Sequence, residues 1–255
     1  TYDKADVEEA LKAQGIEEFV VSTVGSEGTA VQIRVPTLSD EDEVQNLQNG
    51  LETTLLEKYP NMDTDNATAS YVGPVAGATL VRNAIFSVLI AAVLMLIYIA
   101  FRFDLFSGIA AVAGLLHDVL IMISFMVILR NVIQMNSSFI AAMLTIVGYS
   151  INNTIVIFDR IRENNKKPAL AGQPRSEIVE LSVKESLGRT INTTLTTLVT
   201  IVTLYILGVA SIREFSLPII IGILAGAYSA NLINGYVWAA LEDARLARKS
   251  QKKAA

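Results

Sequence analysis

The chain contains no cysteine and only one histidine among its 255 residues. Disulfide bonds and thiolate metal sites are thereby excluded, and the single His117 argues against a histidine-based metal centre. The sequence also lacks a phosphate-binding loop, a pair of catalytic carboxylates and a nucleophile beside a base. We therefore expect no metal, no cofactor and no enzymatic activity.

Charged side chains are distributed unevenly. Residues 1–80 carry 15 acidic and four basic side chains, whereas residues 81–255 carry ten acidic and 16 basic ones. Apolar residues make up 52% of the chain, which is too many for an ordinary soluble domain of this length. The composition predicts an external α+β domain over 1–76, a transmembrane helical bundle over 77–241 and a basic tail over 242–255.

Five apolar runs are long enough to cross a bilayer, since a spanning helix needs about 20 residues. The first two runs are joined by only three residues, which predicts a tight hairpin at Arg102–Asp104. The predicted spans are Val81–Phe101, Leu105–Leu129, Ser138–Phe158, Thr190–Ala210 and Leu217–Leu241.

Lysine and arginine indicate the orientation of the spans, because these residues are enriched in cytoplasmic loops. Segment 159–189 contains seven of them and the tail 242–255 contains five. If the spans alternate in direction, both segments and Arg102 lie on one side of the membrane. We expect this side to be the cytoplasm, with the acidic domain outside.

The external domain is predicted to follow the order α-β-β-α-β. Helices are expected at Asp3–Gln14 and from Ser39 or Asp40 to Tyr59, and strands at Phe19–Val24, Thr29–Val35 and Thr68–Val72. A strand ahead of Thr1 would complete a two-layer sandwich. The second helix has an apolar stripe that we expect to be buried, formed by Val44, Leu47, Leu51, Leu55 and Leu56.

Between the third and fourth spans, residues 166–176 are interrupted by proline and glycine and predict a loop. Ser176–Leu187 is predicted to form a separate, short amphipathic helix. Its apolar residues Ile178, Leu181 and Leu187 would face the membrane or a partner.

His117 and Asp118 lie near the middle of the second span. A charge at that depth costs at least ~2.5 kcal/mol, so ionisable residues there often mark a path for protons or ions. The pair is therefore a candidate ion relay. The alternative is a buried polar pair that links neighbouring helices.

Asn152 and Asn153 occupy the third span, and Arg189 stands where the fourth span begins. The asparagines either hold helices together or line a water path, but an amide carries no titratable proton. Arg189 is either part of the relay or an interfacial arginine that extends to the headgroups. Eight threonine or asparagine residues between 190 and 203 either form a polar interior face or bond their own backbone.

Gly222 and Gly226 form a GxxxG pattern in the last span. Small residues at this spacing allow close helix packing, either within the chain or with a partner, although the motif is weakly specific.

Several segments together resemble the SecF family. These are Val72-Gly73-Pro74, Tyr98–Phe103, Gly114–Leu120 (GLLHDVL), Gly188–Thr197 (GRTINTTLTT) and above all Gly148–Asn164 (GYSINNTIVIFDRIREN). The resemblance implies a six-span bundle of the resistance-nodulation-division type, with an external domain after the first span. This chain would then lack that first span and the first external strand.

Membership in this family would imply a bacterial inner-membrane protein with a cytoplasmic C terminus. With its partner SecD it would use the proton or sodium gradient to assist late preprotein translocation through the SecYEG channel. The implied partners are SecD, SecYEG, the preprotein and the lipid bilayer, with no nucleic acid.

The family usually has aspartate at the position of Asn153, and that carboxylate and an arginine matching Arg189 are implicated in proton flow. The amide is either natural, with SecD supplying the carboxylate, or engineered. One alternative is therefore a scaffold subunit that does not couple to the gradient. A small-molecule exporter of the same superfamily is disfavoured, since the external domain is too small to build a substrate tunnel.

Overall fold

The computed structural model describes residues 2–24, 29–35, 38–65, 67, 69, 71, 74–129 and 136–254. The chain divides into two compact units, Thr1–Arg82 and Asn83–Ala255, which are described separately below.

The N-terminal unit contains two helices and a two-stranded antiparallel sheet. Helix α1 (Lys4–Ala13) begins at Asp3, whose carboxylate accepts a hydrogen bond from the Ala5 amide. Strands β1 (Val20–Val24) and β2 (Ala30–Arg34) pair with Val20 opposite Arg34. Helix α2 (Glu41–Lys58) is capped by Asp40, whose side chain accepts from the Glu43 amide at 2.8 Å. Of the two predicted cap residues, Asp40 is therefore the one used.

The core of this unit lies between the two helices and β1. Val7, Ala10 and Leu11 of α1 are buried with Val21, Leu51 and Leu55. The stripe predicted on α2 is too wide, because Leu56 is 38% exposed and Val44 is only half-buried. Thr68, Ser70 and Val72 of the predicted third strand lie outside the described residues, and the described residues form two strands.

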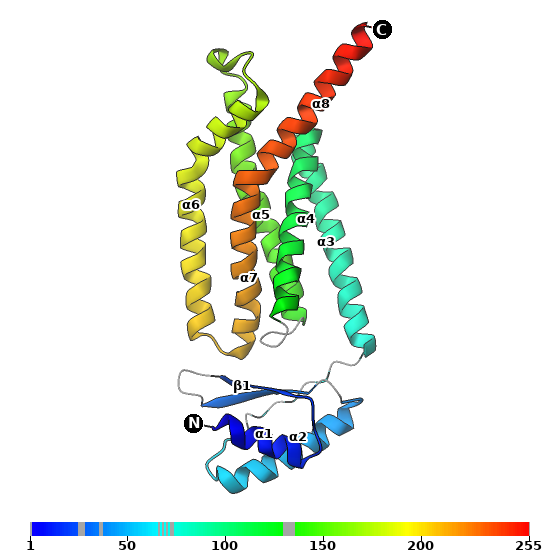
Figure 1. Ribbon diagram of the computed structural model, residues 1–255, viewed down its shortest axis with the longest axis vertical. Helices are drawn as coiled ribbons and strands as arrows, with labels where there is room; N and C mark the ends of the chain where they lie inside the picture. Colours follow the sequence, from blue (N-terminus) through cyan, green and yellow to red (C-terminus); the bar gives the residue numbers. More distant parts are fainter. Residues whose placement is uncertain are drawn as a thin grey trace. The chain divides into compact units, whose positions relative to one another are not determined.

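The second unit is a bundle of long helices, drawn in Figure 1. Among the described residues, five helical segments are long and apolar enough to cross a membrane, which confirms the predicted number of spans. A 3-10 turn, η1 (Pro168–Leu170), lies between α5 and α6. The helices are α3 (Pro74–Arg102), α4 (Leu105–Ile128), α5 (Ser137–Asn164), α6 (Arg175–Leu207), α7 (Ala210–Ser229) and α8 (Gly235–Ala254), with a π-helical turn η2 (Ala230–Asn234) between the last two.

The prediction of a separate amphipathic helix at Ser176–Leu187 is wrong. Arg175–Leu207 forms one continuous helix, because the charged residues interrupt the apolar run but not the helical conformation. Ile178 also does not face outward, since it is buried in the bundle, whereas Leu187 is 40% exposed.

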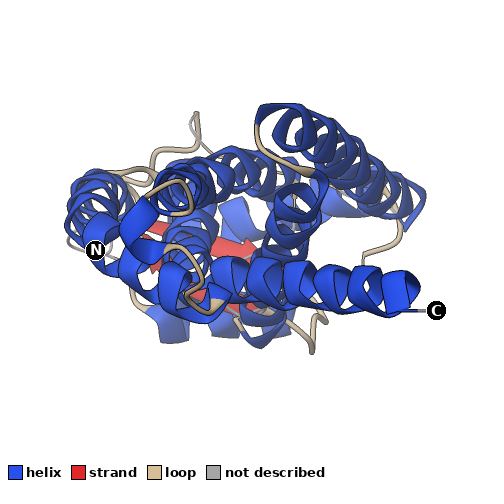
Figure 2. Cartoon of the chain, turned by 90° about the horizontal axis from the view of Figure 1, so that it is seen from above, coloured by secondary structure: helices blue, strands red, loops and turns tan. Residues whose placement is uncertain are grey.

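Helix α7 lies at the centre of the bundle and packs against α4, α5 and α6 (Figure 1). Seen from above, most bundle helices are viewed nearly along their axes, whereas α8 runs across the view to the C terminus (Figure 2). Helices α3 and α6 are the spans least covered by other helices. In their apolar stretches only 17% and 11% of the residues are buried.

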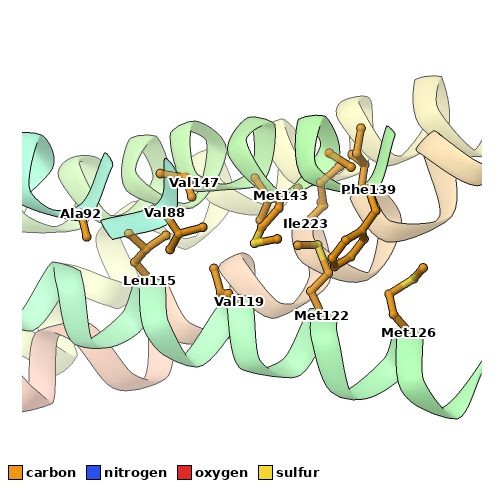
Figure 3. Packing of buried hydrophobic residues seen from close by; sticks show 13 residues of the cluster. Val88, Ala92, Leu115, Val119, Met122, Met126, Phe139, Met143, Val147 and Ile223 are labelled. Carbon is orange, nitrogen blue, oxygen red and sulfur yellow. The ribbon is translucent and has the colours of Figure 1, made fainter. Parts of the chain in front are cut away.

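The main apolar core joins four helices (Figure 3). A row of α4 side chains faces α5, with Ile223 of α7 and Val88 and Ala92 of α3 completing the cluster. The α4 row is Leu115, Val119, Met122 and Met126, and the α5 side chains are Phe139, Met143 and Val147. This core continues the α4 face that carries Asp118, and thereby fixes that residue inside the bundle.

Candidate functional site

Asp118 is fully buried within the bundle, with an exposed fraction of 0%. Its Oδ2 accepts hydrogen bonds from two hydroxyls, from Ser150 Oγ of α5 at 2.5 Å and from Ser229 Oγ of α7 at 2.8 Å. Three helices therefore converge on one carboxylate. Hydroxyl donors stabilise a buried carboxylate, because burial without hydrogen bonds is costly.

His117 connects this carboxylate to the periphery of the bundle. Its Nδ1 lies 3.0 Å from Asp118 Oδ1, and its side chain is 32% exposed. The imidazole also stacks on the ring of Tyr228, with 5.9 Å between ring centroids. The pair therefore joins a fully buried carboxylate to a partly exposed ring.

A second set of polar side chains extends the network away from Asp118. Asn234 Nδ2 donates to Thr154 Oγ1 at 2.7 Å, and Thr154 Oγ1 donates to the Ser150 carbonyl oxygen at 3.0 Å. Asn234 Oδ1 is buried and has no hydrogen-bond partner among the described residues. Gly114 leaves the space for this amide, because a Cβ there would lie 1.9 Å from Asn234 Oδ1.

The π-helical turn Ala230–Asn234 directly follows Ser229. π-helical turns inside α-helices are rare and frequently occur at functional sites. Here the turn begins next to Ser229, which donates a hydrogen bond to Asp118, and ends at Asn234. The turn therefore determines where the side chains of Ser229 and Asn234 point.

The GxxxG glycines lie against α5 of the same chain. A Cβ on Gly222 would come within 2.5 Å of Ile146, and one on Gly226 within 3.1 Å of Ser150 Cβ. The close approach of α7 to α5 brings Ser229 and Ser150 to the same carboxylate oxygen.

The two asparagines of α5 have different surroundings. Asn153 is 2% exposed, and its Nδ2 has no hydrogen-bond partner among the described residues. Asn152 is exposed. Neither residue is among the hydrogen-bond partners of Asp118 that the structure describes.

Arg189 is exposed on α6, and the described part of the chain shows no ion pair between it and Asp118. Most threonines of this helix bond the backbone of the preceding turn, as Thr197 Oγ1 does with the Thr193 carbonyl oxygen at 2.8 Å. Among the described threonines of α6, Thr194 also contacts another helix, where its Oγ1 accepts from the Tyr149 hydroxyl at 3.2 Å. A groove of about 200 Å³ lies beside Thr194, between α6 and α7.

Sequence reasoning identified Asp118 and His117 but not the residues that hold them. Ser150, Ser229 and Asn234 are ordinary polar residues in the sequence, and Gly114 carries no distinctive signal. The local signal was the position of the histidine–aspartate pair near the middle of the second span. The described residues contain no cluster of side chains suited to a metal ion.

Comparisons with known proteins agree on one family. The family model "Protein export membrane protein SecD/SecF, C-terminal" matches residues 52–244. SecDF of Bacillus subtilis is 35% identical over 96% of this chain and 32% of its own length. SecF of Rickettsia bellii is 36% identical over 92% of this chain and 75% of its own length.

A solved structure gives the same result. The crystal structure of SecDF, a translocon-associated membrane protein from Thermus thermophilus, superposes with a TM-score of 0.71 and 34% identity. The similarity covers 95% of this chain and 32% of that protein. The chain therefore spans about a third of the length of the SecDF proteins and three quarters of the Rickettsia SecF.

Proposed function

The chain belongs to the SecD/SecF family of protein export membrane proteins, and from this premise we propose that it is the SecF-type subunit of a bacterial Sec protein-export machinery. In this role it pairs with a SecD-like chain and associates with the SecYEG channel. The complex uses the proton or sodium gradient to assist the late translocation of preproteins. A membrane subunit of this family is not an enzyme.

The observation that carries the proposal is the buried carboxylate of Asp118. Its two hydroxyl donors come from α5 and α7, so a change in its protonation alters contacts on both helices. His117 supplies the exchange of protons with more exposed groups. Uptake and release of a proton at Asp118 would thereby shift the packing of α4 against α5 and α7.

The arrangement of charge supports the proposed orientation. The basic segments 159–189 and 242–255 lie in the cytoplasm, and the acidic domain 1–76 lies outside. The low coverage of α3 and α6 leaves two apolar faces for lipid and a SecD-like chain.

A scaffold role is the second candidate, and Asn153 favours it. This buried amide cannot take up a proton, and Arg189 is exposed in the isolated chain. A scaffold subunit would hold SecD and the channel together, while its partner would contain the complete relay.

Release of a preprotein from vesicles, with and without an imposed proton gradient, separates the two roles. Asp118→Asn keeps the shape of the side chain but removes its titratable proton, so gradient-dependent release should fall while recovery of SecD stays unchanged. Asp159→Asn is the matched control, since Asp159 is an exposed carboxylate at the end of α5 that pairs with Arg102 at 3.5 Å.

Asn153→Asp places a second carboxylate at a position that is 2% exposed. If this chain conducts protons, the substitution should raise gradient-dependent release. Unchanged release in both Asp118→Asn and Asn153→Asp would leave the scaffold role as the surviving function.

A further inference from the structure

A partly open pocket of about 180 Å³ lies at the end of the bundle where α3 meets α4. It is lined by the α3–α4 connection, the end of α5 and the start of α8, through Phe103, Asp104, Ser107, Phe158, Ile161, Arg162, Asn165, Lys166 and Trp238. None of these residues belongs to the Asp118 network. The pocket lies where α3, α4 and α5 reach their charged ends, and we expect the headgroups of a bilayer at this level of the spans.

Two cations of this pocket have no carboxylate partner among the described residues. Arg162 Nη1 donates to the Arg102 carbonyl oxygen at 3.2 Å, and Lys166 is exposed. The neighbouring basic residues are already engaged, since Arg102 pairs with Asp159 and Arg160 pairs with Glu163 and Glu185. The charges of Arg162 and Lys166 are therefore available to an anion.

The lining contains one acidic residue, Asp104, against the two cations. Both oxygens of Asp104 are occupied at the start of α4, where they accept from the Ser107 amide at 2.9 Å and from the Ser107 hydroxyl at 2.7 Å. The pocket thus keeps a net positive charge, and its carboxylate serves as a helix cap.

The floor of the pocket is aromatic. The rings of Phe103 and Phe158 lie with their centroids 6.3 Å apart, and Trp238 is only 6% exposed. The Arg175 guanidinium lies over Trp238 at 6.0 Å and donates to Asn165 Oδ1, which adds a further positive charge at the rim. A soluble anion would gain nothing from the aromatic surface, whereas an amphiphile would use both parts.

We propose that this pocket binds the phosphate-bearing headgroup of an anionic phospholipid, such as phosphatidylglycerol. Arg162 and Lys166 contact the phosphate, and the rings of Phe103, Phe158 and Trp238 contact the adjoining glycerol and the first acyl carbons. Basic pockets between membrane helices recognise anionic headgroups in this way. The pocket volume of about 180 Å³ equals that of several waters, each of which occupies about 30 Å³ of liquid, so the volume suits a headgroup. The acyl chains stay in the bilayer.

Trp238 makes the proposal directly measurable, because it is the only tryptophan of the chain and lines the pocket. The full chain is reconstituted into phosphatidylcholine vesicles that contain brominated phosphatidylglycerol, or brominated phosphatidylcholine at the same mole fraction. Bromine quenches tryptophan fluorescence at short range. We expect severalfold stronger quenching of Trp238 by the anionic lipid, and equal quenching by the two lipids overturns the proposal.

Lys166→Gln is the decisive variant, because no described hydrogen bond or ion pair holds the Lys166 side chain. It should lower the preference for the anionic lipid about fivefold, the effect of one basic residue near an anionic surface. Arg162→Gln should act in the same direction. Lys249→Gln is the control, since it removes one charge from the exposed part of α8 outside the pocket.

An equal loss in Lys249→Gln would show general surface attraction and overturn the proposal. Glycerol phosphate and inorganic phosphate, added in solution, distinguish the source of the phosphate. If either binds the lipid-free protein in detergent as tightly as phosphatidylglycerol does, the pocket binds a soluble phosphate and the lipid assignment is wrong.

Discussion

Asn234 occupies the space that any side chain at Gly114 would need, with 1.9 Å between its Oδ1 and the position of a Gly114 Cβ. The glycine belongs to α4 and the amide to the π-helical turn after α7, 120 positions later in the chain. This fit lets Asn234 reach Thr154 on α5 at 2.7 Å. The packing of three helices around the buried carboxylate thus depends on one missing methyl group.

Gly114→Ala should therefore destabilise the bundle. Overpacking of a close contact costs about 1–3 kcal/mol, and the thermal unfolding midpoint in detergent should fall. Gly148→Ala is the matched control, because a Cβ there meets no atom within 4 Å. Asn234→Ala in the Gly114→Ala background should restore part of the loss. If both single glycine variants unfold at the wild-type temperature, the proposed contact does not limit the packing.

Ser229→Ala should weaken the attachment of α7 to α4. The substitution removes a 2.8 Å hydrogen bond to Asp118, and a buried acceptor that loses its donor costs about 1–3 kcal/mol. Ser124→Ala provides the comparison, since Ser124 is exposed on α4 and bonds only the Leu120 carbonyl oxygen among the described residues. Equal thermal stability of the two variants would contradict the structural role of Ser229.

Acid should destabilise the N-terminal unit through Asp6. The hydroxyl of Tyr59 and the ammonium of Lys58 donate to this carboxylate and lower the pKa of Asp6 below its usual 3.8. A lowered pKa stabilises the fold above the unfolded value, and this stability is lost as pH falls through the folded value. Amide hydrogen exchange of α1 and α2, corrected for the intrinsic rate, should therefore accelerate below about pH 4.

Asp6→Asn should remove this acid step, whereas Glu57→Gln, an exposed neighbour of Lys58, should keep it. On the alkaline side the signs reverse. Hydrogen bonds with Glu9 and Asp6 raise the pKa of Lys58, and the bond to Asp6 raises the pKa of Tyr59. Their stabilisation is present below the unfolded values and is lost as pH rises through the folded ones. The effect is modest because these side chains are partly exposed.

Single cysteines test the orientation, because the chain has none of its own. Glu18→Cys lies in the N-terminal unit and Ala171→Cys lies in the loop between α5 and α6, and both positions are exposed. An impermeant thiol reagent added to intact cells should label only Glu18→Cys. Labelling of Ala171→Cys from outside would contradict the proposed topology, and disruption of the cells before labelling supplies the positive control.

The spans could be predicted because mean hydropathy is a property of consecutive residues in the sequence and needs no knowledge of tertiary contacts. The same reasoning divided α6 at its charged segment, since hydropathy does not report whether a helix continues. In the structure Val179, Ser182 and Thr190 follow one helical stripe that faces the bundle, so tertiary contacts carry the helix through its charges.

The candidate site could be predicted only in part. Asp118 could be singled out because it is a charged residue near the middle of a predicted span. Its contact with Ser229 could not be predicted, because the two residues are 111 positions apart in the sequence. Sequence reasoning also left open whether Arg189 is part of the relay or an interfacial arginine, and this residue is exposed in the structure. Such pairings depend on how the helices pack, and one sequence contains no direct signal for them.

The π-helical turn Ala230–Asn234 makes the length of the chain at this point as important as its composition. Each residue of an α-helix turns the following side chains by about 100°. A π-helical turn holds one residue more than an α-helical turn, so loss of any one of these five residues would let α7 and α8 join as a regular helix. Trp238 and the later side chains of α8 would then keep their direction, because a turn of five π-helical residues and a turn of four α-helical residues rotate the chain by nearly the same angle. A substitution in this turn changes one contact, whereas a deletion would alter the spacing between Ser229 and Asn234, the two polar side chains at its ends.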